Sequence, residues 1–357
     1  MGDAPNGHPH QYLLYEVTKR CQNDCVFCYN VWKEDEGYPD RELSTADALA
    51  LVDKAITETG CKYMGLTGGE PLLRKDIVDI AARISSRGVV PILISNGALL
   101  RREAVERLIE AGVNDFEVSL HSHERGIHDE LVGRSGSYDE ALEAILAVKE
   151  IGGNVSAVFV ATRKNIGGLK RYVELCALLK VTWILFNRIA CGGSCLADFA
   201  TLAPSPSQIQ DALDESAPLA EKYKIGLGVG VQIQPCLLDL SKYPNVRTSF
   251  CPLNNIEGGR TYFAIDPAGN LRMCNRSRIL LGNLLERPFA EAAQAREVAE
   301  FSRAVPEFCA DCDLARVCAG GCKADALACH GTLDRPDPYL EMWKEEVRKP
   351  IGEVRKA

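Results

Sequence analysis

The feature that most constrains the fold is a regular alternation of short apolar runs and amphipathic segments between residue 11 and about residue 190. The amphipathic segments have helical periodicity and lie near residues 45–58, 74–87, 101–111, 137–151 and 168–179. The apolar runs have the length of strands and lie near residues 12–17, 63–67, 90–94, 115–120, 155–161 and 182–189. A strand followed by a helix and another strand forms a parallel βα unit. The pattern therefore predicts an α/β fold with six parallel strands.

Length, charge and cysteine content narrow the class of protein. With 357 residues, 46% of them hydrophobic, the chain has room for an α/β unit of about 200 residues and a smaller domain. Its formal charge of −8 gives no general basic face, so nucleic acid is not expected as a partner. We find no signal peptide and no apolar run of membrane-spanning length, and expect a cytoplasmic protein without membrane contact. Fifteen cysteines there indicate metal or redox use.

Three cysteines stand on a loop directly after the first predicted strand. They are Cys21, Cys25 and Cys28, in a CxxxCxxC spacing. The carboxyl ends of parallel strands carry the functional groups of many α/β folds. Three neighbouring thiolates can hold three irons of a [4Fe–4S] cluster and leave the fourth iron open to another ligand. A zinc knuckle would need a fourth Cys or His nearby, and none follows within thirty residues, which favours the cluster.

Small and polar residues end the next three predicted strands. The second strand runs into Gly68-Gly69-Glu70-Pro71, where glycines allow close backbone approach and a carboxylate can accept hydrogen bonds from an ammonium group. The third strand ends in Ser95-Asn96 and the fourth in Ser119. Each motif alone could be a turn that ends a strand. Parallel strands would bring them all to one rim.

The last third of the chain carries a second group of cysteines. Cys251 and Cys274 flank an expected β-hairpin over residues 261–274 that turns at residues 267–270. A closely spaced array follows, with one more cysteine after it: Cys309, Cys312, Cys318, Cys322 and finally Cys329. CxxC pairs of this kind also hold structural zinc, so two zinc sites are the alternative to iron–sulfur clusters.

The CxxxCxxC loop, with the aromatic Phe27 before its third cysteine, resembles the signature of the radical S-adenosylmethionine (SAM) superfamily. The resemblance implies that the open iron binds SAM and passes it an electron. SAM then breaks into methionine and a 5′-deoxyadenosyl radical, which abstracts a hydrogen atom from substrate. Residues 68–71 match the family's SAM-amine site, and Ser95, Asn96 and Ser119 match its ribose and carboxylate contacts. The implied fold is a partial (β/α)6 TIM-like barrel that is open on one side.

The second cysteine group resembles the SPASM extension of this superfamily, which binds two auxiliary iron–sulfur clusters, expected to be [4Fe–4S]. By analogy, Cys251, Cys274 and Cys322 hold the inner cluster, with Cys236 as a candidate fourth ligand; substrate or water would take that place otherwise. The same analogy assigns the outer cluster to four cysteines: Cys309, Cys312, Cys318 and Cys329. We expect a barrel core over residues 1–200, a linker and helix over 201–235, a SPASM domain of a hairpin, loops and helices over 236–331, and a helical tail over 332–357.

Four cysteines lie outside these groups. Cys61 precedes a strand and Cys176 lies in a helix, where both are expected to be buried. Cys191 and Cys195 flank Gly192-Gly193-Ser194 at the rim that should face substrate. Either one is a candidate hydrogen-atom donor to a substrate radical, as epimerases require; the alternative is a glycine-rich turn with incidental thiols.

The substrate is open between two classes. The resemblance implies maturation of a ribosomally made peptide, with a reductant such as flavodoxin or ferredoxin. The chain begins almost directly with its first strand, so a leader peptide would need a separate binding protein. The alternative is a dehydrogenase or epimerase acting on a small molecule such as a sugar or aminocyclitol. A non-catalytic iron–sulfur or zinc scaffold is the third hypothesis, against which the intact CxxxCxxC and GGEP motifs argue.

Overall fold

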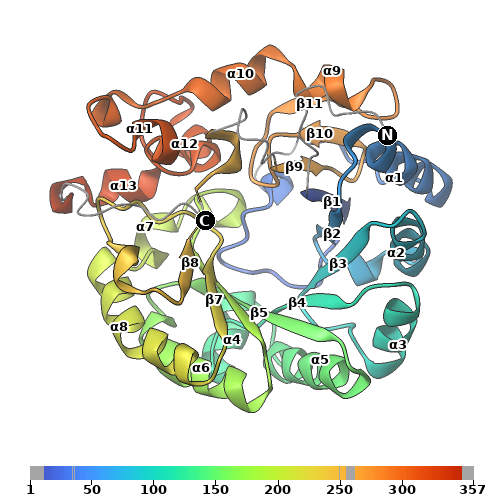
Figure 1. Cartoon of the computed structure of the whole chain (residues 1–357), viewed down its shortest axis with the longest axis horizontal. Helices are drawn as coiled ribbons and strands as arrows, with labels where there is room; N and C mark the ends of the chain where they lie inside the picture. Colours follow the sequence, from blue (N-terminus) through green and yellow to red (C-terminus); the bar gives the residue numbers. More distant parts are fainter. Residues whose placement is uncertain (1–11, 34, 36, 249, 255–261, 348–357) are drawn as a thin grey trace.

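A single eleven-stranded sheet forms the centre of the protein. The computed structural model describes residues 12–33, 35, 37–248, 250–254 and 262–347. The strand order is β11-β10-β9-β1-β2-β3-β4-β5-β6-β7-β8, and the sheet curves into a partial barrel (Figure 1). The strands from β1 to β8 pair in parallel: β1 Tyr12–Thr18, β2 Tyr63–Gly68, β3 Val90–Ser95, β4 Asp115–Ser119, β5 Asn154–Ala161, β6 Trp183–Arg188, β7 Gly226–Val229 and β8 Val246–Thr248.

Helices lie around the outside of this sheet (Figure 1). Local signals set their ends: Ser44 caps α1 through the Asp47 N–H, and Ser205 and Gln208 form a capping box at the start of α8. On β5 every second residue is buried, because that face packs against the helices while the other faces the barrel interior. The helices are α1 Thr45–Thr59, α2 Ile77–Ser86, α3 Arg102–Glu110, α4 Arg125–Val132, α5 Ser137–Ile151, α6 Leu169–Leu178, α7 Phe199–Leu202 and α8 Pro206–Lys222.

The structure confirms the six predicted strands and the predicted α/β class, and it adds elements that the sequence pattern did not reveal. Strands β7 and β8 are short, and β7 contains Gly226 and Gly228. A Cβ atom at Gly226 would lie 1.9 Å from the Trp183 ring, so packing against β6 requires a glycine there. These strands continue the sheet: β7 lies in the segment expected to be a linker and helix, and β8 lies in the segment expected to belong to the SPASM domain.

The predicted hairpin is confirmed and joins the barrel sheet directly. β9 Tyr262–Ile265 pairs in parallel with β1 and antiparallel with β10 Asn270–Arg272, which pairs in turn with β11 Leu280–Asn283. Residue 261 of the expected hairpin lies outside the described residues. Beyond β11 the chain is helical: α9 Phe289–Ala293, α10 Arg296–Arg303, α11 Ala315–Cys318, α12 Lys323–His330 and α13 Pro338–Met342.

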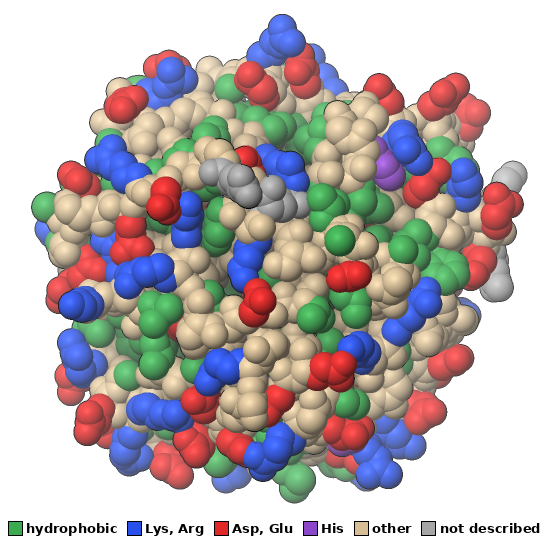
Figure 2. Space-filling view, turned by 180° about the vertical axis from the view of Figure 1, so that it is seen from behind, with side chains coloured by type: hydrophobic (Ala, Val, Ile, Leu, Met, Phe, Trp, Pro, Cys, Tyr) green, Lys and Arg blue, Asp and Glu red, His purple; other side chains and the backbone are tan. Residues whose placement is uncertain are grey.

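The surface charges and the length of the helices bear on the expectations from composition. Positive and negative side chains are interspersed over the face seen in Figure 2. Within the described parts of the chain, no helix is both long enough and apolar enough to cross a bilayer.

Candidate active site

A cavity of about 490 Å³ lies inside the barrel and is walled by both cysteine groups. The loop after β1 contributes Cys21, Cys25 and Cys28 to its wall. Cys251, Cys274 and Cys322 of the carboxyl-terminal third also line this wall. The sheet topology explains this meeting, because β9 lies beside β1 and carries the second group to the first. A molecule in the cavity would therefore contact both sets of thiols.

The CxxxCxxC loop is held in an extended path by the end of α4. The backbone N–H groups of Asp24 and Val26 donate hydrogen bonds to the carbonyls of Val132 and Leu131, each with an N···O distance of 3.0 Å. Burial raises the pKa of the thiols of Cys21, Cys25 and Cys28, and the charges of the other two thiols raise that of Cys25 further. Iron would offset this cost because a bound cation stabilises thiolates. The donor set therefore fits a cluster with one open iron.

The glycines after β2 let the cysteine loop cross the end of the strand. Gly69 N–H donates to the Thr18 carbonyl over 2.8 Å, and a Cβ atom on Gly69 would lie 2.1 Å from the Arg20 carbonyl oxygen. Any side chain here would push the loop away. Gly68 and Gly69 line the cavity, as expected for residues that approach a cofactor.

Glu70 has a different place from the expected one. It is fully buried and outside the cavity wall, as is Pro71. Its carboxylate accepts hydrogen bonds from Leu72 N–H (3.2 Å), Ser95 Oγ (2.9 Å) and Asn96 N–H (2.8 Å). Burial raises the pKa of Glu70 to about 7, although these hydrogen bonds act to lower it. Glu70 thus positions Ser95 and Asn96, and the structure gives no support to direct contact with an ammonium group of SAM.

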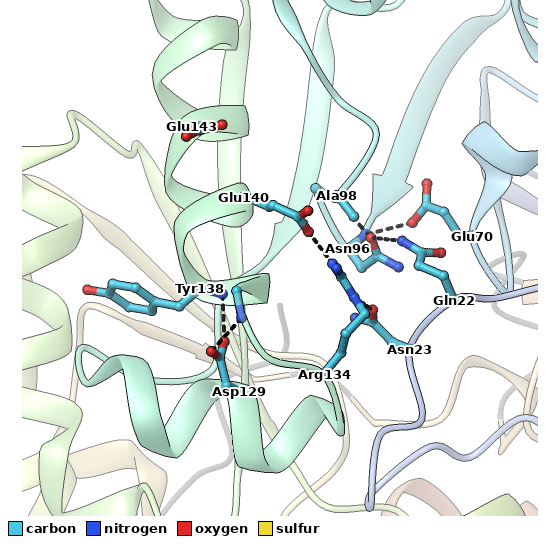
Figure 3. A network of polar contacts seen from close by, with 12 residues as sticks. Gln22, Asn23, Glu70, Asn96, Ala98, Asp129, Arg134, Tyr138, Glu140 and Glu143 are labelled. Carbon is cyan, nitrogen blue, oxygen red and sulfur yellow. Dashed lines mark hydrogen bonds and ion pairs between the residues drawn. The ribbon is translucent and has the colours of Figure 1, made fainter.

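Asn96 connects the rim of β3 to the cysteine loop (Figure 3). Its side chain donates to Cys21 Sγ over 3.8 Å and accepts a hydrogen bond from Gln22 Nε2 over 3.0 Å. Next to it, Arg134 donates to Asn23 Oδ1 over 2.7 Å and pairs with Glu140 of α5. The network fixes the loop from two elements. Phe27, Ser95, Asn96 and Ser119 all line the cavity, as the sequence predicted.

The carboxyl-terminal thiols separate into two sets, but one member differs from the expected partition. Cys236 lies with the outer set, since Cys309 and Cys312 raise its pKa, after burial, to about 11. Its segment packs on the same loop: Gln232 Nε2 donates to Cys318 Sγ over 2.9 Å. This neighbourhood favours the outer set for Cys236 over the inner set expected from the sequence. The described part of the inner set consists of Cys251, Cys274 and Cys322.

Cys329 also differs from its expected place. It forms a disulfide with Cys191, with the two Cα atoms 6.6 Å apart, and is not a free thiol like the other cysteines with which it was grouped. Cys195 is completely buried, and neither Cys191 nor Cys195 lines the cavity. Their loop packs beneath the cysteine loop, where a Cβ atom on Gly193 would lie 2.3 Å from the Cys28 carbonyl oxygen. Both residues therefore stand apart from the cavity wall, and their role as hydrogen-atom donors stays a prediction. Cys61 and Cys176 are buried, as predicted.

Buried charges surround the inner thiols. The Cys322 thiol lies within 4.8 Å of carboxylate oxygens of Asp325 and Asp337, a group that could hold a cation. Both carboxylates instead form ion pairs with Arg188. The nitrogen–oxygen distance to Asp325 is 3.5 Å, and the contact with Asp337 is shorter. Arg276 lies 3.7 Å from Asp325, and Lys323 donates to the carbonyls of Phe301 (2.6 Å) and Ser302 (2.8 Å). Opposite charge therefore neutralises both acids.

Sequence reasoning missed several residues of the cavity wall. Tyr12, Tyr29, Glu117 and Tyr262 line it, and so does Gln232. The sequence contains a weak indication for Glu117, because this residue alternates with the apolar Phe116 and Val118 along the strand. Glu117 therefore faces the barrel interior together with Ser119. No sequence pattern indicates Gln232, since its contact with Cys318 joins loops that are 86 residues apart.

Comparisons with known proteins agree with this geometry. The model of the radical SAM superfamily matches residues 15–174, and that of the SPASM iron–sulfur cluster-binding domain matches residues 251–313. A PqqA peptide cyclase from Granulibacter bethesdensis is 28% identical over 92% of this chain and 87% of its own length. An AdoMet-dependent heme synthase from Methanosarcina barkeri is 26% identical over 95% of this chain and 97% of its own.

Solved structures share the fold. SuiB of Streptococcus suis, bound to S-adenosylmethionine, superposes with a TM-score of 0.70 at 16% identity, covering 92% of this chain and 76% of SuiB. The protein anSMEcpe with bound AdoMet and a Cp18Cys peptide gives a TM-score of 0.68 at 16% identity and covers 95% of both chains. At these identities the similarity establishes the architecture alone.

Proposed function

Because this chain belongs to the radical SAM superfamily and carries a SPASM domain, we propose that it is an oxidoreductase that cleaves SAM reductively and modifies a peptide by hydrogen abstraction. The observation that carries the proposal is the shared cavity, walled by Cys21, Cys25 and Cys28 and also by the inner thiols. A substrate there can lose a hydrogen atom near one set and an electron to the other. Flavodoxin or ferredoxin would supply the electron for SAM cleavage.

We propose that this chain's residues divide the work. Cys21, Cys25 and Cys28 would hold the [4Fe–4S] cluster that supplies the 5′-deoxyadenosyl radical when SAM is bound. Gly68 and Gly69 would admit SAM beside the loop, and Ser95, Asn96 and Ser119 offer polar atoms for its ribose and carboxylate. Glu70 would hold two of these residues in position. Two [4Fe–4S] clusters would occupy the inner and outer thiol sets.

We propose a ribosomally made peptide as the substrate. A relative named PqqA peptide cyclase aligns over 92% of this chain, and SuiB, which has this fold, was solved with its precursor peptide SuiA. Recognition of a leader peptide would fall to a separate binding protein. Incubation with a precursor peptide encoded near this gene should yield a product that lacks two hydrogen atoms by mass spectrometry.

A small molecule is the second candidate, which the similarity to an AdoMet-dependent heme synthase over 95% of the chain favours. A dehydrogenase would use the same hydrogen abstraction and the same transfer of an electron. Epimerisation by a thiol donor would need Cys191 or Cys195 at the substrate, and neither lines the cavity. Mass loss from a small molecule, with candidate peptides unchanged, would select this alternative.

The test of the proposed function is anaerobic reconstitution with iron and sulfide, followed by assay of 5′-deoxyadenosine after reduction with dithionite. We expect about twelve irons per chain, from three four-iron clusters. The triple variant Cys21→Ala/Cys25→Ala/Cys28→Ala should form no 5′-deoxyadenosine. Cys312→Ala should keep part of the SAM cleavage and lose substrate turnover. Equal SAM cleavage by the triple variant and the parent protein would contradict the assignment.

A further inference from the structure

In the described part of the chain, the carboxylate of Glu117 faces the cavity without a hydrogen-bond or ion-pair partner. Glu117 lies in the middle of β4, opposite Ile94 of β3 and Ser156 of β5. Its neighbours Phe116 and Val118 are buried toward the helices, so Glu117 points the other way, into the barrel. It lines the cavity on the same strand as Ser119. Glu117 therefore projects from deeper in the barrel than the residue expected to contact SAM.

The cationic side chains among the described residues of the cavity wall have partners. Lys33 pairs with Asp24 over 2.8 Å, Arg188 pairs with Asp337, and Lys323 donates to two carbonyls. Among the described residues, Glu117 has no hydrogen-bond or ion-pair partner. Buried carboxylates are expensive unless paired, and a carboxylate held open toward a cavity marks a functional site more often than a structural one.

The surroundings of Glu117 are apolar and phenolic. Ile94, Val158 and Leu185 line the same interior from the neighbouring strands. Tyr12 and Tyr29 lie near enough for the Glu117 charge to raise the pKa of each phenol. Burial, with a smaller contribution from Asp115, raises the pKa of Glu117 itself to about 7. A carboxylate of this kind exchanges a proton near neutral pH, which is what a general base requires.

We propose that Glu117 touches the substrate and accepts the proton that the substrate releases when its radical is oxidised. This inference rests on the proposed function. The substrate first loses a hydrogen atom from carbon to the 5′-deoxyadenosyl radical, which becomes 5′-deoxyadenosine. Cys251, Cys274 and Cys322 would hold an oxidised iron–sulfur cluster, which would serve as the acceptor of one electron from the substrate radical. A new bond forms to the oxidised carbon while a proton leaves the adjoining O–H, N–H or C–H group for Glu117. The substrate loses two hydrogen atoms in all.

The test compares Glu117→Gln with Glu110→Gln, a control at an exposed position of α3. The substrate carries deuterium at the reacting carbon. For Glu117→Gln we expect product per 5′-deoxyadenosine to fall about a hundredfold while deuterium still reaches 5′-deoxyadenosine. The control should match the parent protein. Unchanged product yield in Glu117→Gln would overturn the proposal. Joint loss of product and deuterium transfer would also overturn it, because Glu117 would then position substrate or SAM.

A second readout does not depend on turnover. Because the folded-state pKa of Glu117 lies above its ordinary value of 4.5, ionisation of Glu117 lowers the stability of the parent protein as pH rises from about 4.5 through about 7. The groups that face Glu117 are Tyr12 of β1, Tyr29 of the cysteine loop and Asp115 of β4 itself. Relative to parent, the thermal midpoint of Glu117→Gln should rise between pH 5 and pH 8, while that of Glu110→Gln should not. If the thermal midpoints of Glu117→Gln and the parent protein differ by the same amount from pH 5 to pH 8, the Glu117 carboxylate is paired or hydrated. That result would contradict the inference. Absence of SAM cleavage by the parent would instead refute the proposed function, whatever this readout gives.

Discussion

At the scale of single residues, the site is organised by side chains that hold others in place. Glu70 accepts three hydrogen bonds, from Leu72, Ser95 and Asn96. Asn96 in turn donates a hydrogen bond to Cys21 Sγ. Gln232 lies between the two carboxyl-terminal thiol sets: it donates to Cys318 Sγ over 2.9 Å and accepts from Cys251 N–H over 3.3 Å. Hydrogen bonds to cluster sulfurs tune reduction potential, so these positions matter beyond stability.

The regrouping of cysteines leads to a prediction about iron content. Cys236→Ala should remove one ligand of the outer cluster and lower the iron content of reconstituted protein by about four per chain. Cys329→Ala should leave the iron content unchanged, because Cys329 lies against Cys191. Iron counting and electron paramagnetic resonance of both variants would check this.

Cys176→Ala is the matched control, since Cys176 is a buried cysteine of α6 outside all three thiol sets. The ligand partition is wrong if Cys329→Ala loses iron while Cys236→Ala keeps it.

At the scale of elements, a buried ion pair fastens the hairpin to the barrel. Arg272 of β10 pairs with Glu16 of β1, and both side chains are almost completely buried. Arg272 also donates to the Ser277 carbonyl over 3.0 Å. Burial lowers the pKa of Arg272 to about 10, so it stays charged at neutral pH. The pair thus links the strand before the first cysteine group to the strand before Cys274.

Removal of one partner should be costly. Arg272→Met leaves the Glu16 carboxylate buried and unpaired, and we expect the free energy of unfolding to fall by about 3–5 kcal/mol. The double variant Glu16→Gln/Arg272→Met should recover most of this loss, because no buried charge remains. Anaerobic urea unfolding of the three proteins measures the difference. A loss below about 1 kcal/mol for Arg272→Met would equal that of an exposed pair and contradict the interpretation.

At the scale of the whole molecule, barrel and extension share one sheet. β9 covers the edge of β1, so the carboxyl-terminal third completes the barrel as well as carrying thiols. The helices that follow are tied back to β6 and its loop by Arg188–Asp337 and by the Cys191–Cys329 disulfide. Figure 1 shows α13 beside α7, whereas α9 lies above β10 and β11.

A chain that ends at residue 248 should therefore associate more strongly than the full-length chain. It keeps β1 to β8 but exposes the edge of β1, and an uncovered edge strand promotes association between chains. We expect low soluble yield and high-mass species in size-exclusion chromatography. The full-length variant Cys251→Ala/Cys274→Ala keeps β9 without these two thiols, so it should elute as the parent protein does. A monomeric fragment would show that β9 is dispensable for the barrel.

Several parts of the fold and site could be predicted from sequence because their signals are local. The alternation of apolar runs predicts β1 to β6, and the CxxxCxxC and GGEP motifs each lie within a few consecutive residues at strand ends. The β9–β10 hairpin was also predictable, since Asp266 accepts hydrogen bonds from Ala268 and Asn270, two and four residues away. Such motifs can be predicted because residues that are close in sequence are also close in the folded protein.

The sequence by itself thus determined the α/β class, the loop that carries the first three thiols and the set of residues at the barrel rim. Only the tertiary structure decided which distant groups meet: Cys191 with Cys329, 138 residues apart, and Arg272 with Glu16, 256 residues apart. It also decided that Glu70 is fully hydrogen-bonded while Glu117 is left open to the cavity. The physical reason is that partners of buried polar groups depend on strand register and packing between remote segments, which no local pattern encodes.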